Sequence, residues 1–153
     1  SKLLQQSIEH YRRVNQSPVL SISEIYFSRL TCGEYVKLQP DYDTSGKATL
    51  QTIDRSGIAK SVSEMSTGTA DSLYLALRLA SLQHQMESGV ALPVVIDDCL
   101  IQLDDHRALA ALESLSELSK RTQVILFTHH QHLIDLAREG LGDQAVRIHQ
   151  LGA

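Results

Sequence analysis

The sequence has few cysteines, no long apolar run and no excess of positive charge, and each of these features argues against a class of protein or partner. Cys32 and Cys99 stand far apart and match no metal-binding or redox spacing, so we expect reduced thiols in a cytoplasmic protein. No apolar run approaches the roughly 20 residues of a membrane span, and we recognise no signal peptide, so we expect no membrane partner. The formal net charge of -4 supplies no global attraction to nucleic acid, although a local basic patch stays open.

The composition is otherwise that of one globular domain. The chain has 153 residues, of which 42% are hydrophobic, enough for a single core. We expect an α/β fold with a layered, mostly parallel sheet flanked by helices, together with an N-terminal helix and a β-hairpin. The expected helices cover Ser1–Asn15, Ser21–Leu30, Ala70–Met86, Asp105–Leu118 and Gln131–Arg138. The expected strands cover Tyr35–Leu38, Ala48–Ile53, Ile58–Val62, Val94–Ile96, Thr122–Phe127 and Val146–Leu151.

The chain is organised around the stretch Leu92–Asp105, which reads LPVVIDDCLIQLDD. Its apolar, β-branched start is typical of a strand that is buried on both faces in a parallel sheet. Such sheets place their chemistry at the carboxyl ends of the strands, where Asp97 and Asp98 stand. Two carboxylates are costly to bury without a cation, so we predict a magnesium site. The alternative is a pair of solvated acids in a loop.

A histidine cluster follows the next apolar strand. Because parallel neighbours meet at one edge of a sheet, His129 is expected near the aspartate pair, where it could sense a phosphate or bind a metal. His129, His130 and His132 together suggest zinc, but the spacing lacks the second half of any common zinc pattern, so we disfavour that interpretation.

Two further segments precede expected helices. Ser66, Thr67, Gly68 and Thr69 form a loop of small residues, which favours an anion at the helix N-terminus. Asp104 and Asp105 stand before the next helix. For both segments the simpler interpretation is an ordinary helix N-cap.

Taken together, these pieces match the motifs of a known group of ATPases, in order. Met65–Thr69 resembles the signature loop L-S-x-G-x, Val94–Asp98 the Walker B strand, Leu103–Asp104 the D-loop, and His129 the switch histidine. The tracts TADSLYLALRLA (Thr69–Ala80) and FSRLTCGEY (Phe27–Tyr35) are also similar to YhaN-type ATPases. The chain therefore resembles the C-terminal lobe of an ABC-type ATPase head of the SMC, SbcC and RecF group, most closely the YhaN type.

This resemblance implies ATP and Mg²⁺ as cofactors and a role for each matching residue. Asp97 would hold the Mg²⁺ shell, Asp98 would stand at the position of the general base, and His129 would contact the γ-phosphate. SMC and SbcC heads usually carry glutamate at the base position, so the shorter Asp98 implies slow turnover. The Ser66–Thr69 loop would close on ATP held by a second head, and Asp104 would cross that head-to-head dimer interface.

The chain lacks one motif that such a head requires. No G-x-x-x-x-G-K-[ST] loop is present, and the only Gly-Lys pair, Gly46–Lys47, is followed by Ala48. In the superfamily this Walker A loop lies near the N-terminus, before a long coiled coil. We therefore expect residues 1–17 to be the end of a coiled-coil helix and residues 18–153 to be the head lobe. The N-terminal (Walker A) half is the expected partner, without which the chain is inactive.

Three functions compete at this point. The first is the partial head of an SMC-like ATPase in DNA repair or genome maintenance, beside a metal-dependent nuclease subunit and DNA. The second is a self-contained Mg²⁺- or Mn²⁺-dependent phosphohydrolase or nuclease that uses Asp97, Asp98 and His129. The third is a noncatalytic module that presents the Ser66 loop to the nucleotide of a partner.

Overall fold

The computed structural model describes residues 18–42, 46, 48–89, 91–142 and 144–152. The expected helix Ser1–Asn15 and its coiled-coil assignment lie outside these residues. Residues 18–30 are helical, and Pro18 is the first helical residue that the structure describes. Cys32 and Gly33 then adopt positive φ angles of 52° and 75°. The Gly33 amide donates to Ser28 O over 2.7 Å, which ends the helix as the glycine predicts.

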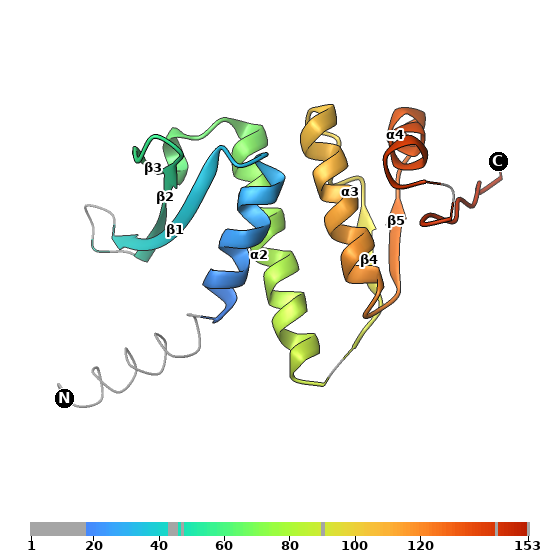
Figure 1. The fold of residues 1–153 in the computed structure, drawn as a ribbon, viewed down its shortest axis with the longest axis horizontal. Helices are drawn as coiled ribbons and strands as arrows, with labels where there is room; N and C mark the ends of the chain where they lie inside the picture. Colours follow the sequence, from blue (N-terminus) through green and yellow to red (C-terminus); the bar gives the residue numbers. More distant parts are fainter. Residues whose placement is uncertain (1–17, 43–45, 47, 90, 143, 153) are drawn as a thin grey trace.

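A small antiparallel sheet follows this helix (Figure 1). Its strands are β1 (Tyr35–Tyr42), β2 (Ala48–Asp54) and β3 (Ala59–Ser61), in the order β1-β2-β3. The predicted hairpin and third short strand are thereby confirmed. A single turn of 3-10 helix, η1 (Val62–Glu64), leads out of the sheet.

The long helix α2 (Thr67–Glu87) lies beside the helix over residues 18–30 (Figure 1). The two are joined by a hydrogen bond of 2.8 Å from the Tyr26 hydroxyl to Gln83 Oε1. The apolar sequence of α2 predicts burial nearly all round, but only one face is buried. Its buried residues include Leu73, Ala76, Leu79 and Ala80. Tyr74 is 57% exposed, because no described element covers the opposite face.

The second half of the chain contains the predicted parallel strands. β4 (Val94–Asp97) pairs with β5 (Val124–Phe127) in parallel, with Asp97 opposite Phe127. α3 (Asp105–Ser119) connects the two strands, and α4 (Gln131–Leu141) follows β5. Both helices begin near the residues predicted from the sequence. The parallel part of the sheet comprises these two strands within the described residues.

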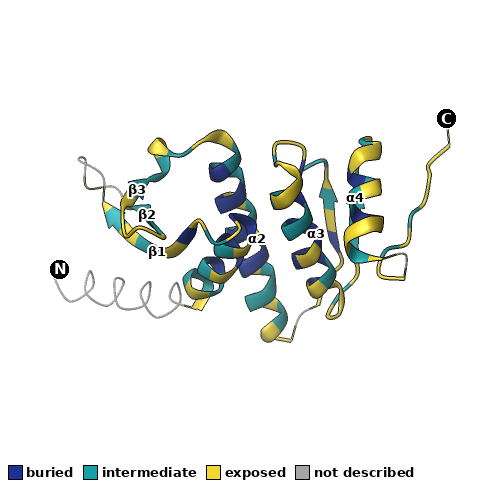
Figure 2. Cartoon of the chain, turned by 45° about the horizontal axis from the view of Figure 1, so that its top comes forward, coloured by how far each residue is buried: buried dark blue, intermediate teal, exposed yellow. Residues whose placement is uncertain are grey.

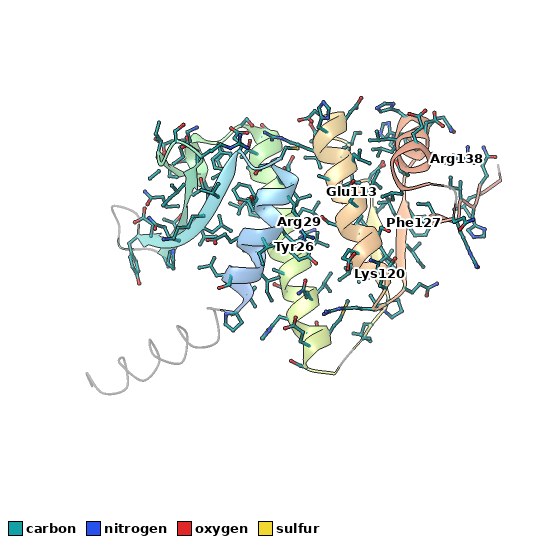
Figure 3. The ribbon with its side chains drawn as sticks, viewed as in Figure 1. Tyr26, Arg29, Glu113, Lys120, Phe127 and Arg138 are labelled. Carbon is teal, nitrogen blue, oxygen red and sulfur yellow. The ribbon has the colours of Figure 1, made fainter. Side chains whose placement is uncertain are left out.

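The parallel pair is covered on one face. α3 packs against β5 and α4, and both α2 and α3 carry buried residues along part of their length (Figure 2). Val95 is 61% and Phe127 (labelled in Figure 3) 42% exposed. The expectation that β4 is buried on both faces is therefore wrong for the described chain, since its helices lie on one side only.

The predicted closing strand Val146–Leu151 is also absent. Residues 144–152 form no strand in the described chain, because their backbone pairs with neither β4 nor β5. The remaining elements share one hydrophobic core, which draws residues from the helix over residues 18–30, from α2, α3 and α4, and from β1 and β4. No helix among the described residues is long and apolar enough to span a membrane.

Candidate functional site

Asp98 and His129 are brought into direct contact by the parallel pairing. Asp98 follows β4 in a left-handed conformation with φ of 45°, and its amide donates to Phe127 O over 3.0 Å. The carboxylate then turns toward the end of β5. Oδ1 accepts a hydrogen bond from the Thr128 hydroxyl at 2.8 Å, and Oδ2 lies 2.5 Å from Nδ1 of His129. The sequence prediction that these side chains meet is confirmed.

These contacts also set the charge state of Asp98. The Thr128 hydrogen bond, together with the nearby His129 and His130, holds the pKa of the Asp98 carboxyl below its usual value. The group is therefore an anion at neutral pH. A carboxylate with a lowered pKa accepts a proton less readily.

The three clustered histidines separate into two groups. The His130 ring lies against the His129 ring, tilted by 41°, with 3.9 Å between ring centroids. His132 is the second residue of α4, and its Nε2 contacts Asp105 Oδ1 at 2.8 Å instead. Of the histidines that the sequence suggested for zinc, only His129 and His130 therefore lie at the Asp98 carboxylate.

Asp97 points elsewhere. Successive residues of a strand alternate between faces, so Asp97 shares the open face with the exposed Val95. Among the described residues, the three-residue group of potential metal ligands at this edge contains Asp98 but not Asp97. The magnesium role of Asp97 stays a prediction, and it would depend on water and phosphate oxygens for the other ligands.

Ser66 acts as the N-cap of α2, as the simpler interpretation predicts. Its Oγ accepts from the Thr69 amide at 3.3 Å and lies 2.9 Å from Thr69 Oγ1. Thr67 is the first residue of the helix. Gly68 passes close to another segment, since a Cβ built on it would lie 3.2 Å from the Gln102 carbonyl oxygen. The small-residue loop is therefore packed directly against the residues that precede α3.

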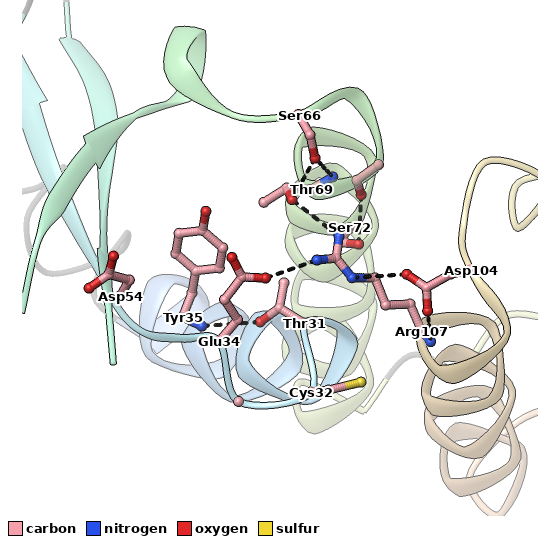
Figure 4. A network of polar contacts seen from close by, with 12 residues as sticks. Thr31, Cys32, Glu34, Tyr35, Asp54, Ser66, Thr69, Ser72, Asp104 and Arg107 are labelled. Carbon is pink, nitrogen blue, oxygen red and sulfur yellow. Dashed lines mark hydrogen bonds and ion pairs between the residues drawn. The ribbon is translucent and has the colours of Figure 1, made fainter. Parts of the chain in front are cut away.

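Asp104 caps α3 by accepting from the Arg107 amide at 3.1 Å, again as predicted. The Arg107 side chain, for which no role was predicted from the sequence, lies between three segments (Figure 4). Nη1 donates to Thr69 Oγ1 at 3.1 Å, Nη2 donates to Glu34 Oε2 at 2.9 Å, and Nε lies 3.4 Å from Asp104 Oδ2. The only sequence signal for this role is a basic residue three positions after an N-cap aspartate.

These segments share one end of the molecule. The N-terminal ends of α2 and α3 lie side by side (Figure 1), and Arg107 joins them through Thr69. Since α3 starts shortly after β4 ends, the carboxyl end of the parallel strands belongs to the same region. The structure thus gathers the small-residue loop, the aspartate pair, Asp104 and His129 at one end. At this end the aspartate carboxylates lie beside two helix N-termini, and helix N-termini attract phosphate.

No protein-family model matches the sequence. The chain is 29% identical to the uncharacterized protein YhaN of Bacillus subtilis over 136 residues, which is 88% of this chain and 14% of YhaN. It is 30% identical to the DNA double-strand break repair Rad50 ATPase of Sulfolobus acidocaldarius over 113 residues, which is 73% of this chain and 12% of that protein. The chain therefore spans a small part of the length of both relatives.

Solved structures agree with these relatives. An SMC ATPase, solved in work on ATP-driven dimerization and DNA-stimulated activation, matches 84% of this chain and 77% of its own chain, with a TM-score of 0.68 and 18% identity. The SMC head domain from Thermotoga maritima matches 82% of this chain and 43% of its own, with a TM-score of 0.56 and 24% identity. Sequence similarity and shared fold together confirm the resemblance: the chain has the fold of part of an SMC-like ABC-type ATPase head.

Proposed function

We propose that this chain supplies the signature loop, Walker B carboxylates, D-loop and switch histidine of an SMC-like ATPase head, which binds and hydrolyses ATP when two heads close. The observation that carries the proposal is the contact of Asp98 with His129 at the carboxyl ends of β4 and β5. Asp98 and His129 follow separate strands and meet at the strand ends, where the attacking water and the γ-phosphate would have to bind.

The residues present fit magnesium and ATP. Asp97 offers an exposed carboxylate, the hard oxygen ligand that Mg²⁺ prefers, and a bound Mg²⁺ would neutralise phosphate charge. The first N–H groups of α2 have no partner within the helix, so Thr67 and Gly68 can donate to a phosphate there. Asp98 would orient and deprotonate the water, and His129 would bind the γ-phosphate once its contact with Asp98 opens.

We propose further that the open face of the parallel pair receives the N-terminal half of the head, which carries the Walker A loop. The printed sequence has no such loop. Val95 and Phe127 leave exposed apolar side chains on the open face of β4 and β5, which also carries Asp97. Each strand has an outer edge with no strand partner among the described residues. A second unit of parallel strands would cover the apolar surface and pair the free edges.

The assembly and its setting follow from the relatives by analogy. We propose a head-to-head dimer in which Ser66, Gly68 and Asp104 face the nucleotide of the other head. The Rad50 relative is named for DNA double-strand break repair, and SMC heads have been solved bound to ScpA. We propose a role in DNA repair or genome maintenance, beside a nuclease subunit, for the protein that contains this chain.

The experiment compares ATP hydrolysis by this chain alone, by the N-terminal half of its parent head alone, and by both mixed. We expect turnover only in the mixture, and loss of that turnover with Asp98→Asn. Arg138→Gln, on the exposed side of α4, is the matched surface control. Turnover by this chain alone, or cleavage of a phosphodiester without ATP, would instead support the self-contained hydrolase. Full turnover with Asp98→Asn would support the noncatalytic module.

A further inference from the structure

We propose that Asp98, His129 and His130 form a binding site for a transition-metal ion of the zinc class, distinct from the magnesium position at Asp97. The site shares Asp98 and His129 with the proposed ATPase function. Its existence does not depend on that function, because it rests on side-chain placement in this chain alone.

The three side chains already lie within reach of a single ion. One ligand atom from each of Asp98, His129 and His130 can be chosen so that all lie within 4.8 Å of one another. Oδ2 of Asp98 is 2.5 Å from Nδ1 of His129, and the two imidazole rings lie 3.9 Å apart with a tilt of 41°. Metal–ligand bonds of about 2.0–2.2 Å hold ligand atoms farther apart than the present Asp98–His129 contact. The ion would therefore take the place of that hydrogen bond. The His129 side chain is 73% exposed and is free to move to accommodate it.

His130 provides an independent observation. Its Nε2 is buried and has no hydrogen-bond partner among the described residues. Buried polar atoms are nearly always satisfied, so an orphaned imidazole nitrogen needs an explanation. An ion bound at Nε2 of His130 would supply the partner that this atom lacks among the described residues.

The donor set selects the metal. Two imidazoles and one carboxylate suit Zn²⁺, Co²⁺ or Ni²⁺, whereas Mg²⁺ prefers oxygen ligands. His132 does not belong to the set, because its Nε2 contacts Asp105 at the start of α3. Three protein ligands leave one position of a four-coordinate site open to water. An ion there would tie Asp98 to His129, so where the proposed ATPase roles hold, zinc would inhibit hydrolysis.

The test is a titration of this chain with Co²⁺ in excess Mg²⁺, followed by the visible d–d absorption and then by displacement with Zn²⁺. We expect one Co²⁺ per chain with the spectrum of a four-coordinate nitrogen and oxygen site. Substituting His130→Ala should weaken the affinity about tenfold or more, since even outer-shell partners cost that much. The matched control His132→Ala should leave the affinity unchanged.

Asp98→Asn is a second variant, in case His130→Ala perturbs the start of α4, and circular dichroism of each variant confirms folding. Absence of Co²⁺ binding would overturn the proposal. If His130→Ala and Asp98→Asn both bound Co²⁺ with the affinity of the unsubstituted chain, the proposal would be overturned too. A thiolate charge-transfer band that assigns the ion to Cys32 or Cys99 would also overturn it. None of these readouts involves ATP, so failure here and failure of the ATPase proposal are distinguishable.

Discussion

Arg107 donates a hydrogen bond from Nη1 to Thr69 Oγ1 over 3.1 Å and thereby joins the first turn of α3 to the first turn of α2. The same guanidinium reaches Glu34, beyond the helix over residues 18–30. One side chain therefore sets the relative position of the proposed D-loop and signature loop, which would have to move together when two heads close.

Replacing Arg107 tests this junction. We expect Arg107→Ala to lower the free energy of unfolding by about 1–2 kcal/mol, because charge-assisted hydrogen bonds are lost and the guanidinium is largely covered, at 18% exposure. Arg107→Lys should recover only part of this, since an ammonium cannot reach three partners as a planar fork does. Urea unfolding of the chain measures both, with Arg138→Ala as the exposed control. An equal effect of the two alanine variants would contradict the role of Arg107.

Gly68→Ala tests the close approach of the two loops. The added Cβ would lie 3.2 Å from the Gln102 carbonyl oxygen, a backbone atom that cannot swing aside as a side chain can. We expect a loss of about 1 kcal/mol in unfolding free energy, since crowding outweighs the gain in helix propensity in a first turn. Gly152→Ala, where nothing lies within 4 Å, should be neutral. A stabilised Gly68→Ala chain would show that Gln102 yields easily.

The buried face of α2 makes a separate prediction. Leu79 is fully buried, so Leu79→Ala should destabilise the chain by about 2–5 kcal/mol through lost burial and the cavity left behind. Tyr74→Ala, on the exposed face of the same helix, should change stability by no more than about 0.5 kcal/mol. Thermal or urea unfolding of the two variants gives the comparison. Similar losses would mean that α2 is covered on both sides.

A substitution on the open face of the parallel strands should weaken assembly without lowering the stability of the chain. Val95→Glu should leave the unfolding free energy of the chain within about 0.5 kcal/mol, because the side chain is exposed. The same change should weaken association with the N-terminal half at least about tenfold, because a buried, unpaired carboxylate is costly. Ile58→Glu, exposed at the turn before β3, should affect neither. Normal association of the Val95 variant would place the partner elsewhere.

Asp54 predicts a dependence of stability on pH. Its carboxylate accepts hydrogen bonds from the Ile58 and Ser56 amides and lies 3.6 Å from Lys60 Nζ, which lowers its pKa. A lowered pKa in the folded state stabilises the chain above the unfolded value, near 3.9, and this contribution is lost as the pH falls through the folded value. Asp54→Asn should therefore be less stable than the parent at pH 6, and the gap should narrow by pH 3. A gap of constant size would exclude the charge of Asp54 as the cause.

Much of this molecule could be predicted from local pattern. Apolar runs and turn residues located the hairpin, both parallel strands and the helices between them, because hydrophobic periodicity and chain-breaking residues act over a few positions. Parallel strands align their carboxyl ends, so the meeting of Asp98 with His129 followed from topology alone. The N-caps Ser66 and Asp104 could likewise be predicted from the residues that follow them in the sequence.

Contacts between distant segments could not be predicted in this way. Arg107 meets Glu34, which lies 73 positions earlier in the chain, and a surface-like arginine in the sequence carries no sign of that partner. The selection of His130 rather than His132 depended on where α4 begins, because His130 is the N-cap and His132 already lies in the helix, which directs the two rings to different neighbours. The Val146–Leu151 segment has an apolar pattern, but a strand also needs a partner edge.

The order of elements, the charged residues at the strand ends and the resemblance to an SMC-like head could therefore be read from the sequence, since each is encoded in neighbouring residues. Tertiary structure alone decided which side chains share a site and which surfaces stay open. It set Arg107 between three segments, gathered Asp98, His129 and His130, and left Val95 and Phe127 uncovered. The physical reason is that packing and ion-pair geometry depend on distances in space, which residue spacing along the chain does not specify.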